Sequence, residues 1–169
     1  PPVILAGEDM FKERHPKELL FMITRQLTFS RPEFLFASVL PYPQFRALLS
    51  AFINMYVPSY PLDVPAEEAD KIKKRISKTL PAERQEQLGQ LVQAYLQGEK
   101  PVTPEQFIEG IEHTANRAGL CLAGDLNICS KVCERDERPD YQIAHRAKIK
   151  ELVLFSASNE YFTFRQRQG

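Results

Sequence analysis

The stretch IEHTANRAGL, residues 111–120, carries the pattern that decides how the fold is interpreted. It places Glu112 and Asn116 four residues apart, so in a helix their carboxylate and amide share one face. The tripeptide Arg-Ala-Gly follows directly. A carboxylate with an amide one turn away is an arrangement by which a helix offers a metal ligand and a supporting partner. The rest of the chain decides whether a metal is expected there.

Length and composition indicate one ordinary globular domain over residues 1–169, with 43% hydrophobic and 26% charged residues. Lysine plus arginine and aspartate plus glutamate both count 22, so no overall field attracts nucleic acid or anionic lipid. No apolar run approaches the roughly 20 residues that a membrane span requires. Because the sequence begins with Pro rather than Met, we expect a piece of a longer protein.

The three cysteines, Cys121, Cys129 and Cys133, are odd in number and crowded together, which is a poor framework for disulfides. A reducing, cytoplasmic location is therefore expected. Their spacing lacks the paired C-x2-C of structural zinc sites, so we expect small core residues rather than a metal cluster with His113. His113 itself is expected at the surface, because it points away from Glu112 by about 100° of helix turn.

Hydrophobic periodicity and capping residues predict a mainly α chain. Helices are expected over residues 17–30, 41–56, 66–79, 82–97, 104–122, 125–132, 141–156 and 159–167. The apolar run PVILA, residues 2–6, predicts one edge strand, and residues 33–40 fit either a strand or a helix. The basic runs, including KIKKR at 71–75 and the cluster Arg146, Lys148 and Lys150, are expected to be solvated helix faces.

The sequence IEHTANRAGLCLAGD, residues 111–125, resembles the third-ligand segment of the HtpX and CAAX-prenyl-protease type of zinc metallopeptidase. That segment usually reads Glu-x-x-Ala-Asp-Arg-Ala-Gly, followed by apolar residues and Gly-Asp. On this resemblance Glu112 stands on the zinc-binding Glu, and Asn116 stands on the Asp that supports it. The resemblance implies a zincin-like helical domain, with one small sheet or edge strand.

The same family carries H-E-x-x-H on an earlier helix, which corresponds here to KELLFMITRQLTFSRPEF, residues 17–34. Arg25 stands on the first His, Gln26 on the catalytic Glu and Phe29 on the second His. An arginine does not lose its proton to become a ligand, and a phenylalanine has no lone pair to give. Gln26 cannot accept a proton as a general base. The resemblance therefore implies the fold of a metallopeptidase without its activity.

These residues define a relict pseudo-active site, namely Arg25, Gln26, Phe29, Glu112 and Asn116. The implied protein is a non-catalytic interaction or scaffold domain without a cofactor, similar to domains of large bacterial proteins that carry tetratricopeptide repeats. Its expected partner is a protein or peptide, including repeats of the same parent chain, and not nucleic acid. Two alternatives stay open: a metal-dependent peptidase with an atypical ligand set, and a structural cap that packs on those repeats.

The resemblance to the metallopeptidase motifs also predicts an internal ion pair between Arg25 and Glu112, which would join the helices at 17–30 and 104–122. A planar, permanently charged guanidinium can meet a carboxylate where zinc would otherwise neutralise it. An uncharged Asn116 avoids a second negative charge beside Glu112. The alternative is that Glu112 is an ordinary exposed helical residue.

Overall fold

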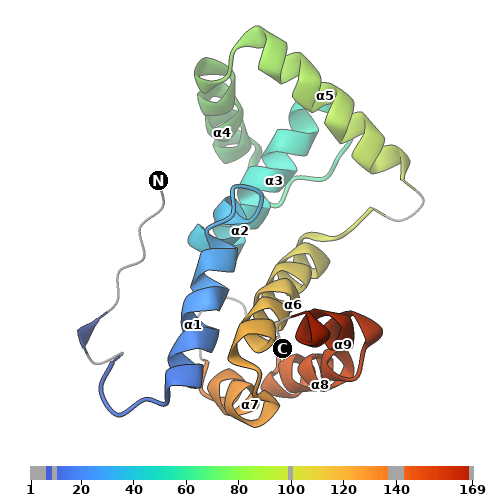
Figure 1. Ribbon diagram of the computed structural model, residues 1–169. Coiled ribbons are helices and arrows are strands. Elements are labelled where there is room, and N and C mark those ends of the chain that lie inside the picture. Colours follow the sequence, from blue (N-terminus) through green and yellow to red (C-terminus); the bar gives the residue numbers. More distant parts are fainter. Residues whose placement is uncertain (1–6, 9–10, 99–100, 137–142, 168–169) are drawn as a thin grey trace. The chain divides into compact units, whose positions relative to one another are not determined.

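The computed structural model describes residues 7–8, 11–98, 101–136 and 143–167 (Figure 1). The helices are α1 (Pro16–Phe29), α2 (Leu35–Val39), α3 (Tyr42–Tyr56), α4 (Ala66–Thr79), α5 (Ala82–Gln97), α6 (Pro104–Ala123), α7 (Leu126–Glu134), α8 (His145–Ser156) and α9 (Asn159–Gln166). The fold is mainly α, as the sequence predicts, and these described ranges contain no strand. The strand predicted at residues 2–6 lies outside them.

The chain divides into two compact units. The first unit comprises residues 1–39 and 105–169 and contains α1, α2 and α6 to α9. The second unit comprises residues 40–104 and contains α3, α4 and α5. The segment at 33–40, for which a strand or a helix was expected, contains the five-residue helix α2.

The sequence predicts that Gly124 ends the helix at 104–122 and that Asp125 caps the helix that follows. Gly124 adopts a left-handed backbone with φ of 63°, and its amide donates to the carbonyl of Leu120 at 2.8 Å. Glycine suits this position because a side chain would be strained there. Asp125 then caps α7, and its carboxylate accepts the backbone amide of Ile128 at 3.1 Å. The predicted break and cap are both confirmed.

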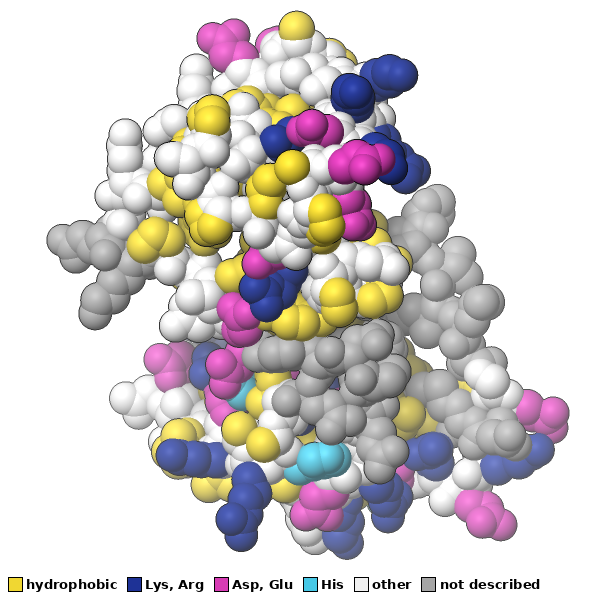
Figure 2. All heavy atoms as spheres, turned by 180° about the vertical axis from the view of Figure 1, so that it is seen from behind, with side chains coloured by type: hydrophobic (Ala, Val, Ile, Leu, Met, Phe, Trp, Pro, Cys, Tyr) yellow, Lys and Arg dark blue, Asp and Glu magenta, His cyan; other side chains and the backbone are white. Residues whose placement is uncertain are grey.

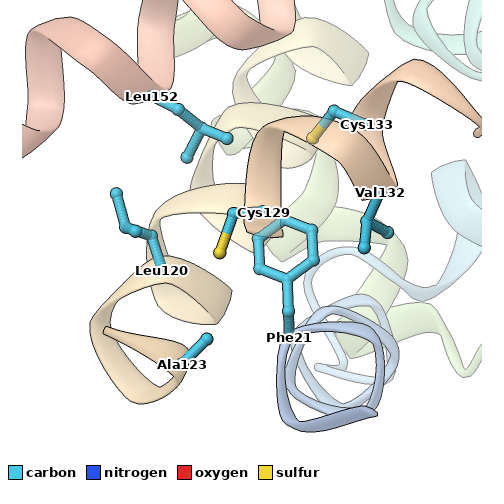
Figure 3. Close-up of a cluster of buried hydrophobic side chains, with 7 residues drawn as sticks. All are labelled: Phe21, Leu120, Ala123, Cys129, Val132, Cys133 and Leu152. Carbon is cyan, nitrogen blue, oxygen red and sulfur yellow. The ribbon is translucent and has the colours of Figure 1, made fainter. Parts of the chain in front are cut away.

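The core of the first unit lies between α1, α6, α7 and α8 (Figure 3). It consists of Phe21, Leu120, Ala123, Cys129, Val132, Cys133 and Leu152. Burial raises the pKa of the Cys129 thiol to about 12 and that of Cys133 to about 11. Both thiols therefore stay protonated near neutral pH and act as small apolar side chains, which confirms the prediction for these two cysteines. Cys121 is only half-buried.

The second unit packs α3 against α4 and α5. Asn54, at the end of α3, donates to the carbonyls of Pro58 and Tyr60 at 3.0 and 2.7 Å. Its side-chain oxygen, Oδ1, accepts from Nζ of Lys73 of α4 at 2.7 Å. One buried amide thus holds the proline-rich loop and α4 on α3, because each of its polar atoms needs a partner once it leaves water.

Aromatic side chains in the stretch around Phe36 and in the C-terminal segment around Phe162 are expected from the sequence to pack in the core. Phe36 is 66% exposed and Phe162 is 56% exposed. Helix α2 has only five residues, and Ala37 is the one that faces the small cluster formed by Phe29, Ile111 and Ala115. The prediction of a core position for Phe36 and Phe162 was therefore wrong.

The contact between α1 and α6 yields a stability test at Gly119. A methyl group at this position would overlap the ring of Phe21, with Cε2 at 2.7 Å and the Phe21 carbonyl oxygen at 3.2 Å. Because Phe21 is fully buried, its ring cannot move into solvent. We expect Gly119→Ala to lower the free energy of unfolding by about 1–3 kcal/mol, measured by urea denaturation.

Gly110 provides the matched control in the same helix. It is exposed, and a methyl group there would meet no atom within 4 Å. Gly110→Ala should therefore raise the free energy of unfolding by roughly 0.5–1 kcal/mol, because alanine favours the helix. Equal stabilisation by both substitutions would contradict the close approach of α1 to α6.

Candidate functional site

The register between α1 and α6 brings the predicted site residues together. Phe21 lies against Gly119, and Phe29 shares a buried cluster with Ile111 and Ala115. Arg25 is midway between Phe21 and Phe29 along α1, so it faces the middle of this stretch of α6. Helices α1 and α6 therefore run antiparallel where they contact each other.

Arg25 and Glu112 form the predicted ion pair. Nη2 of Arg25 donates to Oε1 of Glu112, and the two residues are only 5% and 4% exposed. The prediction of an internal pair between the helices at 17–30 and 104–122 is confirmed. Glu112 is thus not an exposed helical residue.

Two further residues complete this site, and sequence reasoning missed both of them. Asp136 follows α7 and accepts from Nη2 of Arg25 at 2.6 Å. Lys148 of α8 donates to the same oxygen of Asp136 at 3.0 Å and lies 3.5 Å from Glu112. We call Arg25, Glu112, Asp136 and Lys148 the charge cluster. Two cations and two carboxylates make it neutral.

Lys148 corrects the expectation that the basic residues of this region are all solvated. It is 3% exposed, whereas its neighbours Arg146 and Lys150 are exposed. Lys148 shares the inward face of α8 with Leu152, which is four residues further on and fully buried. That spacing from an apolar residue was the available signal in the sequence. Nothing comparable marked Asp136, whose partners are distant in the chain.

The charges shift the proton affinities in the cluster. Burial alone would raise the pKa of Asp136, but attraction and hydrogen bonds from Arg25 and Lys148 outweigh it and lower the pKa to about 2. Burial alone would lower the pKa of Arg25, and the negative charges of Glu112 and Asp136 raise it instead. Both groups are therefore fully charged at neutral pH.

The guanidinium of Arg25 also lies between two aromatic rings. Its central carbon is 5.5 Å from the centroid of Phe21 and 5.8 Å from that of Phe29. Positions 25, 29 and 112 thus converge on one point inside the first unit. Gln26, the fourth predicted site residue, is exposed and is not part of this convergence.

Asn116, the last predicted site residue, is fully buried on the same face of α6 as Glu112. Among the described residues, neither its Oδ1 nor its Nδ2 has a hydrogen-bond partner. The Nε of Arg25 is likewise buried and unpartnered within the described part of the chain. A buried amide with both ends unpaired is rare, because leaving it so costs about 1–3 kcal/mol per group.

His113 differs from its predicted surface position. It is half-buried, with Nε2 3.5 Å from Glu109 and Nδ1 3.9 Å from Glu151 of α8. Arg117 also pairs with Glu151, so the outer face of α6 is tied to α8 by a second group of charges. His113 points away from the charge cluster, as its position next to Glu112 requires.

The donors at the convergence point do not fit zinc. Arg25 and Phe29 supply no lone pair to a metal, and Lys148 adds a second cation near Glu112. Within the described ranges, no three His, Cys, Asp or Glu side chains are grouped to hold a metal ion. None of the helices in these ranges has the length and apolarity of a membrane span.

A double-mutant cycle tests the coupling between Arg25 and Glu112. Arg25→Ala leaves the cluster with a net negative charge, and Glu112→Ala leaves it with a net positive charge. We expect each single change to lower the free energy of unfolding by about 3 kcal/mol. The double variant keeps the neutral pair of Asp136 with Lys148 and should cost clearly less than the sum.

The exposed pair of Glu67 and Lys71, 3.0 Å apart on α4, is the matched control. The same cycle there should give a coupling of at most about 0.5 kcal/mol in urea denaturation. Additive effects of Arg25→Ala and Glu112→Ala would show that the two side chains do not interact in solution.

The lowered pKa of Asp136 predicts that the stability of the protein depends on pH. Because its pKa is lowered in the folded protein, its carboxylate stabilises the fold above the unfolded pKa, and this contribution disappears as the pH falls through about 4 towards 2. At pH 7 we expect Asp136→Asn to be less stable than the wild type by about 1–2 kcal/mol, a value reduced for its partial exposure.

The measurement is urea denaturation of both proteins at pH 7, 5, 4 and 3. The difference between them should shrink as the pH falls. Asp70→Asn, which removes an exposed carboxylate of α4, serves as the control and should show little difference at pH 7. A difference between wild type and Asp136→Asn that stays constant from pH 7 to pH 3 would contradict the lowered pKa.

Comparison with known protein families, characterised proteins and solved structures finds no match to this chain.

Proposed function

We propose that this protein is a non-catalytic protein-interaction or scaffold domain, built on a zinc-metallopeptidase-like helical fold that has lost its metal site. It would act in a bacterial cytoplasm and bind a protein or peptide. The observation that carries the proposal is the ion pair of Arg25 with Glu112. Its bacterial and metallopeptidase-like character rests on the sequence resemblance alone.

The chemistry of the convergence point supports a loss of catalysis. A hydrolytic zinc site needs three protein ligands and a base that activates water. Here position 25 holds a cation, position 29 holds a benzyl group, and Gln26 is exposed and cannot act as a base. Glu112 is already neutralised by Arg25 and lies 3.5 Å from Lys148.

Exposed hydrophobic side chains support a role in binding. Leu27, Leu35, Phe36 and Val39 are 41–69% exposed and come from one short stretch at the end of α1 and in α2. On the face seen in Figure 2, hydrophobic side chains also reach the surface among the charged ones. Clusters of large exposed apolar residues are typical of surfaces that bind proteins or peptides.

Rebuilding the metal site tests the proposed ancestry. We expect the wild type to bind no zinc, and Gln26→Glu alone to confer neither zinc binding nor peptidase activity. The variant R25H/Q26E/F29H supplies two histidines that converge with Glu112, so it should bind zinc and gain thermal stability on adding it. Zinc binding is measured by calorimetry and elemental analysis.

Two controls make this result specific. Adding Glu112→Gln to the rebuilt variant should weaken zinc binding roughly 10-fold or more. Thr24→His with Thr28→His places two histidines on a different face of α1 and should not bind zinc with Glu112. Stoichiometric zinc on the wild type would refute the loss of the site, and a folded rebuilt variant without zinc affinity would refute the resemblance.

Selection from a random-peptide display library tests the binding role. We expect enrichment of apolar peptides that no longer bind after Phe36→Ser or Val39→Ser. Both side chains are more than 60% exposed, so these changes should leave the thermal stability almost unchanged. Leu91→Ser, at an equally exposed apolar residue of α5, is the control and should retain binding. Failure to enrich any peptide, or equal loss with all three variants, would contradict this binding surface.

A further inference from the structure

Asn116 is the buried group that the charge cluster leaves unexplained. The inward face of α6 carries Glu112, Ala115, Asn116 and Gly119, all of them buried. Glu112 is paired with Arg25, and Ala115 and Gly119 make apolar contacts. Both polar atoms of Asn116, in contrast, lack a partner among the described residues. A leucine would fill such a position without any polar demand, so the amide calls for a polar ligand.

The register of α1 indicates which group lies opposite. Phe21 contacts Gly119, and Phe29 shares its cluster with Ile111 and Ala115. These contacts bracket Arg25, which therefore lies at the level of Asn116. Within the described chain the Nε of Arg25 is also buried without a partner, while its Nη2 is occupied by two carboxylates. Two unpartnered polar groups thus come from facing turns of two helices.

Charge and size restrict the ligand. The charge cluster is neutral, with two cations and two carboxylates, so an additional ion of either sign would be left without a counter-charge. Asn116 is fully buried and Arg25 is only 5% exposed, so a ligand that contacts both must be small enough to be enclosed. The groups on offer are N–H donors from Arg25 and Asn116 and one carbonyl acceptor. A small neutral molecule that both donates and accepts meets these conditions.

We propose that one internal water molecule bridges the Nε–H of Arg25 and the side-chain amide of Asn116. The water accepts from Arg25 and donates to Oδ1 of Asn116, which satisfies two of the three unpartnered atoms of these two side chains. It holds the guanidinium plane so that Nη2 stays directed at Glu112 and Asp136. This proposal concerns the present packing and does not depend on the proposed function.

Water contacts of the Asn116 side chain test the proposal directly. In a 15N-edited ROESY and NOESY pair on the labelled wild-type protein, the Asn116 amide protons should show a cross-peak to water with the sign of a long-lived contact. Asn127, which is exposed on α7, is the control and should show no such long-lived contact. Absence of the cross-peak at Asn116, or a side chain bonded directly to protein in a high-resolution crystal structure, would overturn the proposal.

Arg25→Lys separates a bridging water from one bound to Asn116 alone. Lysine keeps a cation beside Glu112 and Asp136 but lacks the Nε–H. We expect the variant to fold and the long-lived water cross-peak of Asn116 to be lost. A cross-peak that persists unchanged in Arg25→Lys would show that Arg25 does not hold the water, and the bridge would be wrong.

Discussion

A guanidinium that cannot give up its proton, placed inside the protein, is the constraint on which the rest of the first unit depends. A buried lysine or carboxyl group can become neutral when its environment is unfavourable, but Arg25 stays charged at every pH at which the protein folds. Its surroundings must therefore supply negative charge. Glu112 supplies one such charge from α6 and Asp136 supplies another from the end of α7. Two carboxylates exceed one cation, and Lys148 restores neutrality from α8.

These ion pairs join α1, α6, the end of α7 and α8, and they restrict the relative positions of these elements more than the apolar core does. Phe21, Leu120, Cys129 and Leu152 could tolerate small shifts of register, because hydrophobic contact is not directional. The ion pairs require their partners within hydrogen-bond distance, and a shifted partner would leave a buried charge. Buried ion pairs are weak evidence for net stability. In this protein we expect the core to supply most of the stability and the charges to fix the arrangement of the helices.

The helices and two of the four residues of the charge cluster could be predicted from the sequence. Helices depend on residues close together in the chain, whereas the cluster joins residues that are far apart in it. The bounds of α4 and α5 follow from prolines and local periodicity and match the structure. Arg25 and Glu112 were identified because two motifs could be set against a known pattern. Lys148 was assigned to the surface because lysine is rarely buried without a partner, and its partner Asp136 had no motif to reveal it.

The permanent charge of Arg25 also bears on the proposed function. A carboxylate in the interior can be neutralised by a metal, a proton or a cationic side chain, and these exclude one another at a single position. A bound metal can be removed by a chelator, which would leave the carboxylate able to bind a cation again. The Arg25 side chain belongs to the protein itself and cannot be removed in this way. On the proposed descent from a metallopeptidase, the permanent cation at position 25 would keep Glu112 neutralised whatever the pH and the metal supply.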